Sequence, residues 1–240
     1  MADTPGLDDW RRLLADTVDV ARDIGCQPCV VETLAGMVGD ARAEQWRPNG
    51  PFWMFMGDFK AWEALARTAV AALPAAELAR TVVQTFSDQL RFEQLQATRL
   101  DRLLLKRAYP DGSKLPALTR EAWKYVPWAA SLVILAAVRR KPALDDASAI
   151  TLLRAMRRAL LHWAADFVAE PDLPIKQVLA WLATHRFAEP ARAAPLVDDI
   201  DKTLTLVPAG DAEDRRYVAK LAASVQALRA QLAGPGSPAG

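Results

Sequence analysis

Cysteine, histidine and glycine are scarce in this chain of 240 residues, which contains two cysteines, two histidines and 11 glycines. Two cysteines three residues apart cannot staple a fold of this size, so a disulfide framework is excluded. With so few histidines, general acid–base chemistry would have to rest on carboxylates, and we find no well-spaced pair. A glycine-rich phosphate loop and a nucleophile elbow are also missing from the sequence. The sequence therefore gives no positive reason to expect an enzyme, a metal site or another cofactor.

Long apolar segments are also missing. The longest uncharged stretch runs from residue 125 to residue 138, and as a helix it would span roughly 21 Å, against about 30 Å for a hydrocarbon core. The first residues have neither the basic nor the apolar region of a secretory signal. From these features and the Ala- and Arg-rich composition we expect a bacterial-type cytoplasmic protein without stable membrane insertion.

Charge of one sign is not in excess, because 30 basic and 29 acidic residues give a net charge of +1. This balance argues against a protein that coats nucleic acid through bulk charge. Hydrophobic residues make up 52% of the chain, which excludes disorder throughout and allows a sizeable core.

Apolar residues recur at steps of three and four along nearly the whole chain, which is the period of an amphipathic helix. The sequence therefore predicts an all-α protein, a single compact multi-helix bundle of about eight or nine helices. We expect one domain over residues 1–233 and a flexible C-terminal tail at residues 234–240. The segment 75–109 contains neither proline nor glycine and predicts one long central helix.

Glycine and proline mark several helix boundaries. Gly25 suits the end of the first helix and Pro28 the start of the second, expected over residues 28–46. Gly36 and Gly39 within that second helix indicate a close contact with a neighbouring helix. Further along the chain, Asp145 or Asp146 is expected to cap the N-terminus of a helix. Pro174 and Pro195 are each expected in the first turn of a helix. The corresponding helices are expected at residues 146–168, 174–187, 195–206 and 212–232.

Cys26 and Cys29 form a C-x-P-C pattern between the first two helices. A sulfur at a helix N-terminus can have a lowered pKa, so the pair is a candidate redox site. A redox site of the thioredoxin type needs a preceding strand that the sequence does not predict. Two ordinary structural cysteines remain the alternative.

Five consecutive large apolar residues cannot all lie on the buried face of one helix. This run is a candidate partner-binding surface, since aromatic and methionine side chains suit adaptable contacts. It consists of Phe52, Trp53, Met54, Phe55 and Met56.

Positive charge is concentrated in residues 91–192, which hold 17 basic and 10 acidic residues. Arginine outnumbers lysine in the chain by 22 to 8, and arginine suits bidentate contacts with carboxylate or phosphate. Alternatively, these side chains are solvated or pair within the chain. The candidate anion-binding residues are Arg99, Arg102, Lys106, Arg154, Arg158 and His162.

Three functions agree with these features. The leading hypothesis is a non-catalytic helical interaction protein, meaning a scaffold, adaptor or accessory subunit that binds a protein partner or self-associates. The first alternative is binding of nucleic acid or another anionic ligand by the Arg-rich face of residues 91–192. The second alternative is a helical enzyme or carrier with an apolar, Trp-lined pocket, because the chain contains eight tryptophans.

Overall fold

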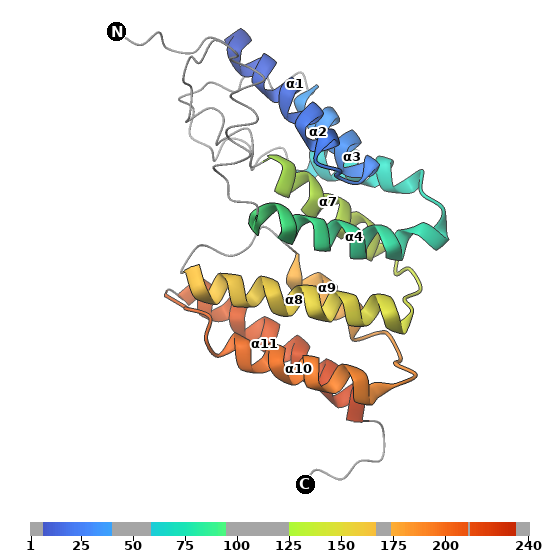
Figure 1. Ribbon diagram of the computed structural model, residues 1–240, viewed down its shortest axis with the longest axis vertical. Helices are drawn as coiled ribbons and strands as arrows, with labels where there is room; N and C mark the ends of the chain where they lie inside the picture. Colours follow the sequence, from blue (N-terminus) through green and yellow to red (C-terminus); the bar gives the residue numbers. More distant parts are fainter. Residues whose placement is uncertain (1–6, 40–58, 95–124, 167–173, 211, 234–240) are drawn as a thin grey trace. The chain divides into compact units, whose positions relative to one another are not determined.

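The computed structural model describes residues 7–39, 59–94, 125–166, 174–210 and 212–233 (Figure 1). Within these ranges the secondary structure consists of nine α-helices, without a strand, which confirms the predicted all-α class. The helices are α1 (Leu7–Asp23), α2 (Pro28–Val38), α3 (Phe59–Ala71), α4 (Ala75–Gln94), α7 (Tyr125–Arg139), α8 (Asp146–Asp166), α9 (Ile175–Leu182), α10 (Pro190–Leu204) and α11 (Ala212–Ala233).

The chain forms two compact units. Unit 1 comprises residues 1–74 and 91–136, and unit 2 comprises residues 75–90 and 137–240. One boundary therefore lies in the connection between α3 and α4, and the other two fall inside α4 and inside α7. The single domain expected over residues 1–233 stays a prediction.

In unit 1, the end of α1 is set by Gly25. This residue has a φ of +83°, a left-handed conformation that glycine adopts at little cost. The amide of Gly25 donates to the carbonyl of Arg22 at 3.1 Å, and the amide of Cys26 donates to the carbonyl of Ala21 at 3.0 Å. These two bonds are those of a Schellman cap, so Gly25 ends α1 as predicted.

The second helix, α2, starts at Pro28 as predicted, with Gln27 at the N-cap. It ends at Val38, and the residues from 40 onward, to which we expected it to continue, lie outside the described ranges. Gly36 faces Leu65 of α3, because a Cβ at position 36 would lie 3.1 Å from both δ-carbons of Leu65. The close helix contact expected at Gly36 is therefore present between α2 and α3.

The interior of unit 1 consists of apolar side chains at helical spacing. Trp62 of α3 lies against two rings of α7, with ring centroids 6.3 Å from Tyr125 and 5.9 Å from Trp128. The other buried residues of this unit include Leu13, Leu14, Leu34, Met37, Ala66, Val70 and Val126.

Unit 2 contains two helical hairpins. In the first, α8 and α9 run antiparallel, since the indole Nε1–H of Trp181 at the end of α9 donates to the carbonyl of Pro142, just before α8, at 3.1 Å. In the second, α10 and α11 run antiparallel, joined by Arg229, which bonds to Asp198 at 2.8 Å and to Asp201 at 3.0 Å.

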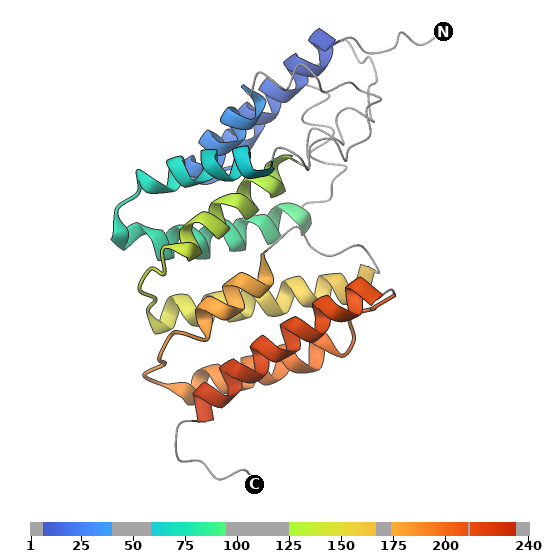
Figure 2. The same cartoon turned by 180° about the vertical axis from the view of Figure 1, so that it is seen from behind.

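The two hairpins stack with equivalent helices parallel. The contacts between Asp146 and Ala188 and between Arg157 and Asp199 each join residues 42 positions apart in the sequence, so α8 and α10 run side by side in the same direction. Gln231 of α11 donates to the carbonyl of His185, just after α9. In Figure 2, α9 and α11 accordingly form one layer and α8 and α10 the other. The shared core includes Leu152, Leu153, Met156, Leu160, Val178, Leu179, Leu182, Val197, Ile200, Leu221, Val225 and Leu228.

Several expected boundaries need correction. α9 begins at Ile175, with Pro174 at the N-cap and not in the first turn. It ends at Leu182, five residues before the expected end, because the following loop is bonded to the N-terminus of α8. α10 begins at Pro190, with Glu189 at the N-cap, so Pro195 lies inside this helix and not in its first turn. The predicted long helix begins at Ala75 as α4, and its expected continuation beyond Gln94 lies outside the described residues.

Candidate functional site

Part of the predicted site residues lies outside the described ranges. These are the apolar run from Phe52 to Met56 and the basic residues Arg99, Arg102 and Lys106. His162 belongs to α8, but its side chain is also among those not described. The structure therefore places only Arg154 and Arg158 of the predicted anion-binding set.

Arg154 and Arg158 are exposed on α8, and no described residue pairs with either of them. They share one side of the helix with Thr151 and with Leu161, whose exposed fraction is 38%. We call these four residues, spaced three, four and three apart, the α8 outer face.

The neighbouring Arg157, in contrast, forms an ion pair. Its Nε lies 3.1 Å from Oδ2 of Asp199 on α10, so this arginine links the two helices. Asp198 and Asp201 of the same helix pair with Arg229 of α11. The aspartate cluster of α10 is therefore balanced by arginines, and among the described residues no group of three His, Cys, Asp or Glu side chains could hold a metal ion.

Cys29 lies in the first turn of α2, where the helix N-terminus favours a thiolate. Burial has the larger effect, however, because the residue is only 3% exposed. Desolvation outweighs the hydrogen bonds from the backbone amides and raises the pKa of the Cys29 thiol to about 11. This direction is opposite to the lowered pKa that a redox role for Cys29 requires. Both Cys26 and Cys29 are free thiols.

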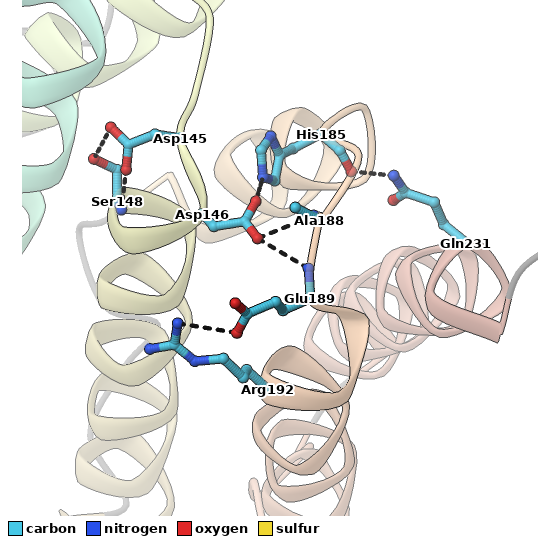
Figure 3. Close-up of polar contacts among 8 residues, drawn as sticks. All are labelled: Asp145, Asp146, Ser148, His185, Ala188, Glu189, Arg192 and Gln231. Carbon is cyan, nitrogen blue, oxygen red and sulfur yellow. Dashed lines mark hydrogen bonds and ion pairs between the residues drawn. The ribbon is translucent and has the colours of Figure 1, made fainter.

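A polar cluster that sequence reasoning missed joins the N-terminus of α8 to the loop between α9 and α10 (Figure 3). Nε2 of His185 lies 2.8 Å from Oδ1 of Asp146, and Oδ2 of Asp146 accepts the amides of Ala188 at 3.0 Å and of Glu189 at 3.2 Å. Gln231 binds the carbonyl of His185. We call these five residues the Asp146 cluster. In the sequence, His185 follows Asp146 by 39 positions, and no local pattern connects them.

The hydrogen bonds of the cluster favour the charged form of Asp146. The bond with His185 is the main reason that the pKa of Asp146 is lowered from its ordinary value of 3.8, and the amides of Glu189 and Ala188 act in the same direction. The adjacent Asp145 caps α8, because its carboxylate accepts the amide of Ser148 at 2.7 Å and the Ser148 hydroxyl at 3.1 Å. Of the two aspartates that the sequence offered as caps, Asp145 is therefore the cap.

A His–Asp pair can serve as a catalytic base with its orienting carboxylate, but the geometry here favours a structural role. Both oxygens of Asp146 are occupied, and the exposed fraction of the His185 side chain is only 11%. The ring of Phe187 covers the imidazole edge-on, with centroids 4.6 Å apart. The hydroxyl of Ser148, in the first turn of α8, donates to Asp145 and not to His185. The Asp146 cluster therefore ties α8, the α9–α10 loop and α11 together.

Comparison of the chain with protein-family models, with curated proteins and with solved structures finds no match. Of the helices that the structure describes, none has both the length and the apolarity required to cross a bilayer. Of the predicted anion-binding residues, the structure shows Arg154 and Arg158 exposed to solvent on the α8 outer face.

Proposed function

We propose that this chain is a helical interaction protein, a scaffold, adaptor or accessory subunit that binds a protein partner without catalysing a reaction. The observation that carries the proposal is the parallel stacking of the α8–α9 and α10–α11 hairpins in unit 2. Stacked helical hairpins are the building principle of α-solenoids, in which rows of equivalent helices form extended surfaces that bind other proteins.

The contacts inside unit 2 fit a rigid support for such a surface. Arg157 and the Asp146 cluster fix α8 against the second hairpin, and Arg229 fixes α10 against α11. A binding surface on fixed helices loses little conformational freedom when a partner binds, so more of the contact free energy is retained as affinity.

Native mass spectrometry of the full chain, purified gently from its own source, tests this proposal. We expect a complex of defined stoichiometry with a second protein, or a defined homo-oligomer, that forms again when the purified components are mixed. Hydrogen exchange of the complex should show protection on helices of unit 2 that are exposed in the free chain.

Two results would contradict the proposal. One is a monomer that carries a small molecule and turns it over, which would favour the enzyme or carrier alternative. The other is a complex with nucleic acid alone that dissociates as salt is raised, which would favour the anionic-ligand alternative.

A further inference from the structure

The α8 outer face separates cleanly from the buried side of the helix. Leu153, Met156 and Leu160 are fully buried in unit 2, whereas Arg154 and Arg158, one turn apart, are exposed. Residues four apart lie one above the other on the same side of a helix. The two guanidinium groups therefore project from neighbouring positions into solvent.

Arg154 and Arg158 are exposed arginines four residues apart on one helix, and neither has a described carboxylate partner, a feature that they share in unit 2 with Arg186, Arg215 and Arg216. Arg157, Arg192 and Arg229 each lie within ion-pair distance of a carboxylate, while no described carboxylate pairs with Arg154 or Arg158. Two like charges at positions i and i+4 repel each other. An anionic partner removes this repulsion and gives both guanidinium groups planar acceptors for bidentate hydrogen bonds.

Leu161 decides which class of anionic partner fits best. It continues the same side of α8 one turn beyond Arg158. Among the described residues, Leu161 and Leu206 are the large apolar side chains that are exposed. A protein segment offers carboxylates and apolar side chains together, whereas a nucleic-acid backbone offers phosphates without an apolar group at that spacing.

We infer that the α8 outer face binds an acidic, amphipathic segment of a protein partner. Arg154 and Arg158 bind carboxylates of the segment, and Leu161 packs against one of its apolar side chains. This inference rests on the proposed function and assigns it a surface and a partner chemistry. Electrostatic attraction of this kind raises the association rate and weakens with salt.

The first experiment uses a defined probe. A fluorescein-labelled helical peptide of glutamate and leucine, with the leucines on one side, is titrated with the full chain while fluorescence anisotropy is recorded. We expect the double variant Arg154→Glu/Arg158→Glu to weaken binding by about tenfold or more, because two charge-assisted contacts become repulsive. Leu161→Ser should weaken binding by about threefold, in line with the loss of one partly exposed apolar contact.

Matched variants separate a specific effect from a general one. Arg67→Glu makes the same charge change on α3, at another exposed arginine without a described partner, and should change the affinity by less than about twofold. Arg154→Lys/Arg158→Lys keeps the charge but loses the bidentate geometry, so it should give an intermediate affinity. Equal thermal unfolding of all variants shows that the fold is unchanged.

Three results would overturn the inference. The double variant could bind the peptide as tightly as the original chain, or single-stranded DNA of equal charge could bind more tightly than the peptide through the same arginines. The partner complex isolated from the source could also persist unchanged in the double variant. This last result would leave the proposed function intact, whereas absence of any complex by native mass spectrometry would refute the proposed function itself.

Discussion

Asp146 shows how a single carboxylate holds the α9–α10 loop against the N-terminus of α8. Its two oxygens accept hydrogen bonds from His185, Ala188 and Glu189, and these bonds are made best by the charged form. The pKa of Asp146 is lowered in the folded state, with the bond to His185 as the main cause. Asp146 therefore links the stability of unit 2 to pH.

A lowered pKa fixes the direction of this pH dependence. Asp146 contributes its full stabilisation at pH values above its ordinary pKa of 3.8, and the contribution is lost as the pH falls through the lower pKa of the folded state. We expect Asp146→Asn to reduce stability at neutral pH and to flatten the loss of stability in acid. Urea unfolding at several pH values measures both effects.

The control for this prediction is Asp19→Asn, which removes an exposed ion pair with Arg22 on α1. Exposed pairs of this kind contribute about 0–1 kcal/mol, so the control should change stability little. An Asp146→Asn variant with the same acid unfolding profile as the original chain would show that Asp146 does not cause the pH dependence.

Gly25 gives a second prediction at the residue scale. Its φ of +83° lies in the left-handed region, and a Cβ there would meet no atom within 4 Å. The cost of a substitution is therefore backbone strain alone, and we expect Gly25→Ala to lower the free energy of unfolding by about 1 kcal/mol. Gly25→Asn should cost less, because asparagine tolerates this conformation better. Equal stability of the three proteins by urea unfolding would contradict the assignment of strain at this position.

At the scale of elements, the close contact between α2 and α3 limits the size of the side chain that fits at position 36. Gly36 lies against the δ-carbons of Leu65, so a larger side chain at position 36 must displace that leucine. We expect Gly36→Leu to lower the free energy of unfolding by about 2 kcal/mol through overpacking. Ala35→Leu is the matched control, because Ala35 is the adjacent residue and is exposed. Helix propensity alone would make Gly36→Leu more stable, because leucine favours a helix more than glycine does. Thermal or urea unfolding of both variants decides the prediction, and a Gly36→Leu variant at least as stable as the original chain would contradict overpacking.

The boundaries that the sequence predicted correctly depend on local chemistry. Gly25, Pro28 and Asp145 act within a few residues of the helix ends that they define, by a positive φ, a fixed φ and a side-chain cap respectively. The start of α10 was predicted wrongly because Pro190 and Pro195 both suit a first turn. The end of α9 was predicted too late because the loop after it is held by Asp146, a residue of another helix.

The candidate site was less predictable, because its contacts also join residues of different helices. Arg154, Arg157 and Arg158 lie on one helix, and their spacing alone does not tell which of them meets a carboxylate. The answer depends on the 42-residue offset between α8 and α10, which brings Asp199 to Arg157 and leaves the other two arginines exposed. The contact between Asp146 and His185 likewise forms only when α8 and α9 are folded together as a hairpin, so it could not be predicted from the local sequence. The charge and exposure of the α8 outer face could be expected from the sequence. The sequence could not tell that Arg157 pairs with a carboxylate while Arg154 and Arg158 do not.

At the scale of the whole molecule, the two compact units share helices, and this sharing bears on how the chain unfolds. One division between them lies after Pro74, in the connection between α3 and α4, and the other two lie inside helices, after Leu90 in α4 and after Ala136 in α7. Unfolding of one unit would remove turns from helices that also belong to the other, and short isolated helices are marginal in water. We therefore expect one cooperative transition, in agreement with the predicted single domain. Differential scanning calorimetry should give equal calorimetric and van't Hoff enthalpies. Two separate transitions, with Gly36→Leu lowering only one midpoint and Asp146→Asn only the other, would instead show that the units are independent domains.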